Sequence, residues 1–345
     1  MRKTLVNALV ATALATLASG QEPRPADGSQ LSDEGQEART REGYYALPPG
    51  MPVVHPYELP LAVALDQKEL PRDLSFRSGV LHFTGDPGAT ETVILVEVPL
   101  EDMETRVEPA TGAWRAHVSM LAYVRDAEGR LASRLSRDWP LRGTGSPSGL
   151  LGRNVMLKRT LRLAPGRYTL ETAVRDRESG HIGARRVPFV VPAASPDLSL
   201  GSVAVVRFQP APPGGRDASD PLLIRGMRAL PVLGAPVSAG SGQIGLITSL
   251  HPERGAGPVS VTVEFRRAGE VLAQASPEIP KPDPDGRITL AHRFTLPSVE
   301  PGRYEIHVRV RQGKESASAV TSFQLARGTP LGILSPDVAR AGAWR

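Results

Sequence analysis

Pro165-Gly166-Arg167-Tyr168 is followed by the run Thr169–Arg175, and Pro301-Gly302-Arg303-Tyr304 is followed by the run Glu305–Arg311. The two copies start 136 residues apart, at positions 165 and 301, which is the length of a domain. A repeat at this spacing indicates two units of the same architecture, each with one copy near its C-terminal end. The chain is therefore organised around a duplicated β-domain.

The repeated tetrapeptide predicts a turn that leads into a strand. Proline presets φ at the first inner position of the turn, and Gly166 and Gly302 supply the positive φ that follows. From Tyr304 on, apolar and charged side chains alternate, as in a strand with one face in a core and one in water. Such a tyrosine resembles the tyrosine corner of immunoglobulin-like sandwiches, whose hydroxyl bonds to upstream backbone. We interpret Tyr168, Tyr304, Gly166 and Gly302 as structural corner residues; a hairpin with a buried tyrosine is the simpler alternative.

Length and composition agree with an all-β protein. A chain of 345 residues accommodates two domains of ordinary size and a tail. Gly (34) and Pro (33) are abundant while aromatic residues make up 5%, which favours short strands joined by turns over helices. We therefore predict two tandem immunoglobulin-like or fibronectin type III-like β-sandwiches. Because the sequence contains no Cys, it predicts no disulfide and excludes a thiol nucleophile.

The N-terminus has the pattern of a secretory signal. Arg2 and Lys3 precede the apolar run Leu5–Leu17, which is too short to predict a membrane-spanning helix, and Ala18–Gly20 supplies small residues for cleavage. We predict a signal peptide over residues 1–20, no transmembrane segment after its cleavage, and an extracytoplasmic location, either periplasmic or secreted. Cleavage lowers the formal charge from +5 to +3 at pH 7, which argues against a nucleic-acid partner.

The rest of the chain divides by composition. Residues 21–58 are rich in proline and polar residues and predict a disordered linker. Residues 59–193 are assigned to the first sandwich, with an N-terminal extension in which Leu59–Leu70 holds a short helix, and residues 197–326 to the second. Pro192–Asp197 is interpreted as a hinge between the two units, and residues 327–345 as a flexible tail.

Each unit contains about seven runs with strand character, the number that an immunoglobulin-like sandwich needs. The expected strands of the first unit, after an initial run Val80–Phe83, are Thr92–Val98, Met103–Val107, Trp114–Val124, Leu131–Leu135, Val155–Leu163, the Tyr168 strand and Ala184–Val191. Those of the second unit are Ser202–Phe208, Gln243–Leu250, Val259–Phe265, Val271–Ala275, Arg287–Leu296, the Tyr304 strand and Ala319–Leu325. The run Thr92–Val98 is largely apolar without interruption and predicts a central strand.

No motif in the sequence assembles a reactive centre. Gly240–Gly245 has the glycine spacing of a dinucleotide site, but a strand follows it instead of the required helix. Asp283–Gly286 lacks the later acidic ligand of a calcium loop, and Gly145–Gly149 places Pro where a hydrolase needs its nucleophile. The histidines show no paired metal-ligand spacing, and His117 and His307 are expected on outward strand faces. We therefore predict no enzyme activity, no cofactor and no bound metal.

Four arginines are expected on outward positions of the second unit: Arg266, Arg267, Arg309 and Arg311. Such a group could form a basic strip for an anionic polymer or a lipid headgroup. An ordinary solvated sheet face explains the same residues and is the favoured interpretation.

Several segments carry a resemblance to a known family: Leu95–Leu100, Ala116–Ser119, Val124–Arg130, Leu163–Leu170, Val174–Asp176 and Ser179–Gly183. They resemble the C-terminal β-sandwich region of exported bacterial proteins that carry a von Willebrand factor type A-related domain upstream. The resemblance covers about residues 80–325 and implies an exported β-sandwich module of unassigned function. The type A domain itself is missing, because Asp73–Arg77 and Asp197–Gly201 lack the second Ser of its metal site, so metal-dependent adhesion is not implied.

These observations predict an exported, noncatalytic binding or scaffold protein that contacts another extracytoplasmic protein through sandwich loops or sheet edges. One alternative is an extracytoplasmic hydrolase whose site is assembled from residues far apart in the sequence. Another is a carbohydrate-binding module, which would need clustered aromatic side chains. The wide spacing of Trp114, Trp139 and Trp344 gives that alternative little support.

Overall fold

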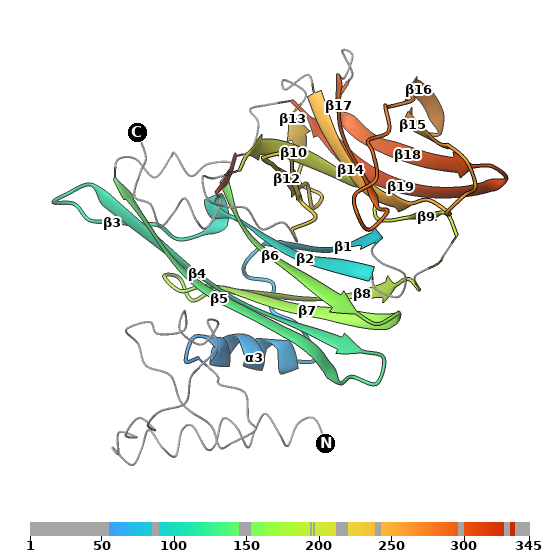
Figure 1. Cartoon of the computed structure of the whole chain (residues 1–345). Helices are drawn as coiled ribbons and strands as arrows, with labels where there is room; N and C mark the ends of the chain where they lie inside the picture. The colour runs from blue at the N-terminus through green and yellow to red at the C-terminus, as the bar shows by residue number, and fades with distance from the viewer. Residues whose placement is uncertain are drawn as a thin grey trace.

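The computed structural model describes residues 55–84, 90–144, 153–193, 195, 197–211, 220–238, 243–295, 300–327 and 332–334. The predicted signal peptide and most of the predicted linker lie outside these residues. The described chain is almost entirely strand and forms two β-sandwiches in tandem (Figure 1). The predicted all-β fold of two tandem immunoglobulin-like sandwiches is confirmed.

We number the four sheets 1 to 4 in the order in which they stack, and sheets 1 and 2 form the first sandwich. Sheet 1 contains β3 (Arg106–Val107), β4 (Ala113–Asp126), β5 (Leu131–Thr144), β7 (Gly166–Asp176) and β8 (Ile182–Val191). Sheet 2 contains β1 (Arg77–Thr84), β2 (Thr90–Pro99), β6 (Arg153–Leu163) and β20 (Gly332–Leu334). The short 3-10 helix η1 (Leu100–Asp102) follows β2.

Sheets 3 and 4 form the second sandwich. Sheet 3 contains β9 (Ser199–Leu200), β10 (Ala204–Pro210), β11 (Leu223–Ile224), β12 (Met227–Pro231), β14 (Gln243–His251) and β17 (Ile288–Thr295). Sheet 4 contains β13 (Val237–Ser238), β15 (Val259–Arg267), β16 (Glu270–Ala275), β18 (Gly302–Gln312) and β19 (Glu315–Ala326). The pairings β6–β20 and β13–β19 are parallel, and the other ladders of the described residues are antiparallel.

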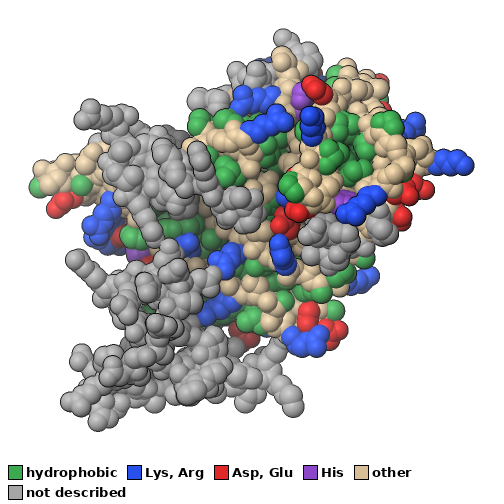
Figure 2. Space-filling view, viewed as in Figure 1, with side chains coloured by type: hydrophobic (Ala, Val, Ile, Leu, Met, Phe, Trp, Pro, Cys, Tyr) green, Lys and Arg blue, Asp and Glu red, His purple; other side chains and the backbone are tan. Residues whose placement is uncertain are grey.

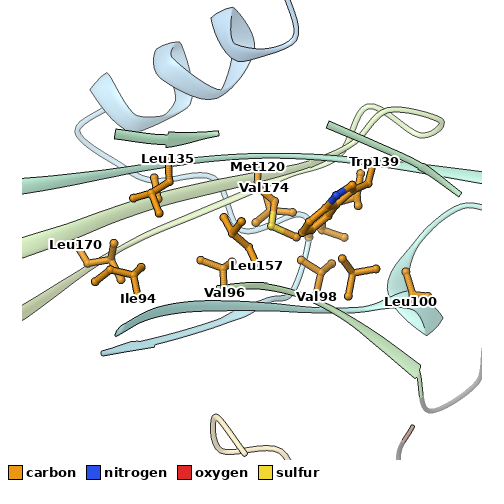
Figure 3. Packing of buried hydrophobic residues seen from close by; sticks show 14 of the residues in the cluster. Ile94, Val96, Val98, Leu100, Met120, Leu135, Trp139, Leu157, Leu170 and Val174 are labelled. Carbon is orange, nitrogen blue, oxygen red and sulfur yellow. The ribbon is translucent and has the colours of Figure 1, made fainter. Parts of the chain in front are cut away.

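Each sandwich closes on its own apolar core. In the first, Val96 and Val98 from sheet 2 pack with Met120 and Trp139 from sheet 1, and these side chains meet between the two sheets (Figure 3). In the second sandwich, the alternating apolar residues of β18 are buried with those of β14 and β15. The alternation read in the sequence after Tyr304 therefore corresponds to one buried and one exposed face.

A third apolar core lies between the sandwiches. Val93 and Leu95 point away from the first core and pack against sheet 3, where Val206 and Ile247 are buried. Strand β2 is thus covered on both faces, which explains its nearly continuous apolar sequence, since a strand buried on two faces shows no alternation. Burial of each such side chain contributes about 1.5–3 kcal/mol. The segment predicted as a hinge, Pro192–Asp197, therefore joins two units that stack face to face.

Polar contacts cross the same boundary. The backbone N–H of His82 donates to Ser202 Oγ at 2.9 Å, and burial lowers the pKa of the His82 imidazole. Glu97 is fully buried and lies 3.7 Å from Arg77 and 3.9 Å from Arg207. Because a buried charge is tolerated only with such partners, these contacts help to fix how sheet 2 meets sheet 3.

Helix α3 (Glu58–Asp66) lies on the outer face of sheet 1. Its Leu61 and Leu65 are buried against the sheet residues Leu121, Ala173 and Ala184. The short helix predicted between Leu59 and Leu70 is confirmed. It is the only α-helix of the described residues, and none of these residues forms a helix long and apolar enough to span a membrane.

Two of the predicted segment boundaries need correction, the end of the N-terminal linker and the start of the C-terminal tail. Residues 55–58, assigned to the disordered linker, lead into α3, and the buried carboxylate of Glu58 accepts from His55 N–H at 3.0 Å and pairs with Arg134. Residues 332–334, assigned to the flexible tail, form β20 and pair with β6. The backbone of a free sheet edge recruits such segments, and composition does not reveal this.

Strand β5 is also longer than predicted. It continues beyond Leu135 to Thr144 and pairs along nearly all of β4. Pro140 is tolerated there because β5 is an edge strand, the place in a sheet where proline is usually found.

Candidate functional site

The four predicted corner residues occupy equivalent places in the two sandwiches. Tyr168 Oη donates to the carbonyl of Ala164 at 2.9 Å, and Tyr304 Oη donates to the carbonyl of Glu300 at 2.6 Å. Both bonds reach back four residues, as in a tyrosine corner. Gly166 has φ of +157° and Gly302 has φ of +154°, values that other residues rarely adopt. These residues shape the turn before β7 or β18, which is a structural role.

The two tyrosines differ in their surroundings. Tyr168 is half-buried and stacks on Phe189 at a centroid distance of 5.5 Å, while Tyr304 is buried and stacks on Phe323 at 5.6 Å. Tyr304 also lines an apolar depression in the second sandwich. We take this depression, which we call the edge groove, as the candidate functional site.

The edge groove opens between the two sheets of the second sandwich and has a volume of about 180 Å³. Its lining residues come from strands of both sheets: Phe265, Leu272, Ala273, Gln274, Ala275, Phe294, Thr295, Tyr304, Phe323 and Leu325. The groove is bounded by β16, an edge of sheet 4, and by β17, an edge of sheet 3. Neither strand has a second ladder partner among the described residues.

Strand β16 presents one exposed apolar side chain to the groove, that of Leu272, which is 47% exposed. Val271 is 50% exposed but does not line the groove. The pairing register with β15 shifts between Phe265 and Arg266, so that Phe265 faces Ala273 and Arg266 faces Val271. Leu272 is therefore the extra residue of a β-bulge, a feature that re-aims side chains at sheet edges. Figure 2 shows hydrophobic side chains gathered at the surface near β16 and β17.

Aromatic rings form the floor of the groove. Phe265 and Phe294 meet edge to face, with centroids 5.1 Å apart and an interplanar angle of 69°. At one end, the Arg267 guanidinium lies 5.6 Å from the centre of the Tyr304 ring and pairs with Glu300 at 3.0 Å. The hydrogen bond with Glu300 raises the pKa of Arg267 above its ordinary value. The groove therefore offers apolar contact surface with one fixed cation beside it.

The lining residues carry few polar side chains: the amide of Gln274 and the hydroxyls of Thr295 and Tyr304. None of them is a general acid or base near neutral pH, and the Tyr304 hydroxyl is already bonded to backbone. The arrangement can bind an apolar group and hydrogen-bond a peptide backbone. It does not supply the groups that a hydrolysis reaction needs.

A second cluster lies on the outer face of sheet 1, where Ser119, His117, Asp138 and Arg177 come together. Ser119 Oγ donates to Asp138 Oδ1 at 2.5 Å, and His117 Nε2 lies 3.0 Å from the same oxygen. Arg177 donates to Asp138 Oδ2 at 3.0 Å. In a hydrolase triad the imidazole accepts the serine proton, whereas here serine and histidine both bond to the carboxylate. The cluster therefore does not activate Ser119.

Asp138 is the central residue of this cluster. Burial alone raises the pKa of its carboxyl group, but hydrogen bonds from His117 and Ser119 and the nearby charges of His117 and Arg177 outweigh burial and hold the pKa below its usual value. Sequence reasoning missed this residue because it placed the end of the strand at Leu135. The alternation that continues to Asp138 was the available signal.

The sequence motifs that resemble a calcium loop and a dinucleotide site contain residues with structural roles. Asp283 Oδ1 accepts the N–H of Asp285 and of Arg287, and Oδ2 pairs with Arg287 at 3.1 Å, so its oxygens stabilise a turn. Gly245 lies on β14, where a Cβ atom would come within 2.5 Å of the Val206 carbonyl. Gly145–Gly149 and residues 240–242 lie outside the described residues. Among the described residues no group of three or more His, Asp or Glu could hold a metal ion.

The aromatic residues of the described chain do not form a sugar-binding platform. Trp139 is buried in the first core and Trp114 packs against it, while Trp344 lies outside the described residues. The exposed large hydrophobic side chains are aliphatic: Val63, Val107, Leu131, Val190, Val271, Leu272 and Val320. The described residues therefore show no cluster of strongly exposed aromatic side chains of the kind on which sugar rings stack.

No family model and no curated protein matches the chain. Among solved structures, 76% of the chain is similar to 23% of an Escherichia coli alpha-2-macroglobulin activated by porcine elastase, with 9% identity and a TM-score of 0.21. Over 74% it is similar to the whole of a titin immunoglobulin tandem, with 11% identity and a TM-score of 0.16. Over 72% it is similar to 98% of the chicken interferon gamma receptor alpha chain, with 8% identity and a TM-score of 0.17. Scores of this size carry no argument about site or function.

Proposed function

We propose that this chain is an exported, noncatalytic binding protein whose second sandwich captures an extended segment of another extracytoplasmic protein at the edge groove. The observation that carries the proposal is an edge strand, β16, whose exposed Leu272 lines an apolar groove. The extracytoplasmic location rests on the N-terminal signal pattern and on the resemblance to exported β-sandwich proteins.

Strand addition explains how such an edge binds. An extended segment pairs its backbone with the free N–H and C=O groups of β16, and its alternate side chains enter the groove. An apolar cavity of about 150 Å³ holds benzene. A groove of about 180 Å³ therefore has room for one aromatic or branched aliphatic side chain. Backbone pairing supplies affinity, and the groove supplies specificity for that side chain.

The proposal is tested by selecting extended peptides from a displayed library on the purified mature chain. We expect enriched peptides to carry a large apolar residue with polar neighbours. Leu272→Glu should weaken their binding at least tenfold, because it places a charge at the groove mouth. The matched control is Val320→Glu on β19, a position 56% exposed on the outer face of sheet 4, which should change binding less than twofold.

Hydrogen exchange gives a second readout of the same complex. Backbone amides of β16 should become protected when the peptide binds, and the peptide should be recovered intact by mass spectrometry. The proposal fails if no selected peptide distinguishes the parent chain from Leu272→Glu, or if protection appears away from β16 and β17. Cleavage of the bound peptide would contradict the noncatalytic role.

A further inference from the structure

The outer face of sheet 4 presents a regular array of cationic and hydroxyl side chains. Strand β18 lies between β15 and β19, and its outward residues Arg309 and Arg311 are both exposed. Residues two apart on one strand are separated by about 6.6–6.8 Å. The two guanidinium groups therefore arise from one straight row at the centre of the sheet. We call this row, with its flanking hydroxyl residues, the arginine ladder.

Each arginine of the ladder has a hydroxyl residue on both sides. Arg309 faces Thr262 on β15 and Ser318 on β19, and Arg311 faces Ser260 and Ser316 on the same strands. Ser260, Ser316 and Ser318 are exposed. The array therefore consists of two successive rows with the pattern hydroxyl, guanidinium, hydroxyl.

The charges of the arginine ladder differ from those of the neighbouring arginines. Arg266 pairs with Glu264 at 2.6 Å, and Arg267 pairs with Glu300 at 3.0 Å. Neither Arg309 nor Arg311 has a carboxylate within ion-pair distance among the described residues. The field of Arg309 helps to lower the pKa of Glu264, after the larger effect of its hydrogen bond from Arg266. Among the described residues, the expected basic strip thus consists of two arginines held in ion pairs, Arg266 and Arg267, and two without an ion pair.

We propose that the arginine ladder binds a linear acidic polysaccharide, with the guanidinium groups paired to its carboxylates and the Ser and Thr hydroxyls bonded to its sugar hydroxyls. Guanidinium groups bind carboxylates in bidentate geometry, and hydroxyl side chains both donate and accept hydrogen bonds. Val271 and Val320 are the large apolar side chains strongly exposed among the described residues of this face, which is too little for insertion into a membrane.

The first experiment measures binding of polygalacturonate to the mature chain at two salt concentrations. Arg309→Gln with Arg311→Gln should weaken binding at least tenfold and make its salt dependence shallower, because two ion pairs to the polymer are lost. The matched control, Arg266→Gln with Arg267→Gln, removes the same formal charge from the same sheet. It should weaken binding less than threefold, since those guanidinium groups are occupied by carboxylates.

The hydroxyl residues are tested separately. Ser316→Ala with Ser318→Ala should weaken polygalacturonate binding several-fold and leave its salt dependence unchanged, because the removed contacts carry no charge. The proposal is overturned if both arginine double variants lose the same affinity, which would indicate a response to net charge alone. It is equally overturned if uncharged dextran binds as well as polygalacturonate, or if phosphatidylglycerol vesicles bind more tightly than the polymer.

Discussion

The two sandwiches share the repeated turn and the tyrosine corner, but they differ at the edge beside the central hairpin. In the first, β5 is a 14-residue strand that buries Leu135, Trp139 and Leu141. In the second, the equivalent strand β16 has six residues and turns only Ala273 and Ala275 toward the core. The edge groove therefore results from a short strand and two small side chains, and both units keep the same strand order around it.

The sandwiches also differ in what covers their outer faces. Sheet 1 carries α3, which buries Leu121 and Ala173, whereas the outer face of sheet 4 shows a row of exposed arginines. The faces that meet, sheets 2 and 3, are joined by a third core. Within the described residues, the first unit is thus filled and covered, and the second keeps an open edge and an uncovered outer face. This division favours the first sandwich as support and the second as the binding unit.

The largest expected effect on stability comes from removing a large side chain that β5 buries in the first sandwich. Trp139→Ala should lower the free energy of unfolding by about 3–5 kcal/mol, because a buried aromatic side chain is lost and a cavity remains. Urea unfolding followed by circular dichroism measures this change. Trp114→Ala is the control, since Trp114 is only partly buried, and it should cost less. Equal losses for the two variants would contradict the role assigned to Trp139.

The third core predicts that the two sandwiches unfold together. Leu95→Ala removes a side chain buried between sheets 2 and 3 and should lower the free energy of unfolding by about 2–5 kcal/mol. Hydrogen exchange should show reduced protection in both sandwiches, including β18. A variant that loses protection in the first sandwich alone would show that the shared core does not couple them.

The repeated corner allows the same substitution in two environments. Tyr304→Phe removes the bond to the Glu300 carbonyl from a buried site and should lower the free energy of unfolding by about 0.5–1.5 kcal/mol. Tyr168→Phe should cost less, because Tyr168 is half-buried and water can replace its hydroxyl at the Ala164 carbonyl. Thermal unfolding of the two variants under identical conditions measures the difference. The reverse order would contradict this account of the corners.

A smaller effect concerns pH. The pKa of Asp138 is lowered in the folded chain, so its contribution to stability is present above the unfolded value of about 3.9 and is lost as pH falls through the folded pKa. The contribution should stay below about 1 kcal/mol, since the cluster is partly solvated. As the pH falls below about 4, the free energy of unfolding should therefore decrease less for Asp138→Asn than for the parent chain. Asp285→Asn, on an exposed turn, is the control for the loss of one carboxyl group.

Local patterns predicted most of the strands and both corners, because alternation and turn residues act within a few positions. The nearly continuous apolar run at β2 predicted a central strand, but no pattern predicted that its second face packs against Val206 and Ile247 of sheet 3. Contacts of this kind join segments that are more than a hundred residues apart. For the same reason, the pairing of residues 332–334 with β6 was not predicted.

The candidate site was less accessible to sequence reasoning. The edge groove exists because Ala273 and Ala275 lie opposite aromatic residues of other strands, and an isolated alanine carries no signal of a neighbouring space. The arginine ladder was visible as outward arginines. Which of them are neutralised depended on side-chain geometry, as the pairs Arg266–Glu264 and Arg267–Glu300 show. Sequence spacing alone does not distinguish paired from unpaired charges.

The smallest effect on stability is expected from a substitution that fills the edge groove, and the same substitution should abolish peptide binding. Ala275→Leu places new methyl groups in the edge groove, where space exists, so the free energy of unfolding should change by less than about 1 kcal/mol. The peptides selected on the parent chain should no longer bind, because their apolar side chain has lost its site. Ala275→Ser keeps the groove open and should retain binding. If Ala275→Leu still binds the peptides at full affinity, the segment pairs along another edge, and the contrast between the filled first sandwich and the open second one does not explain recognition.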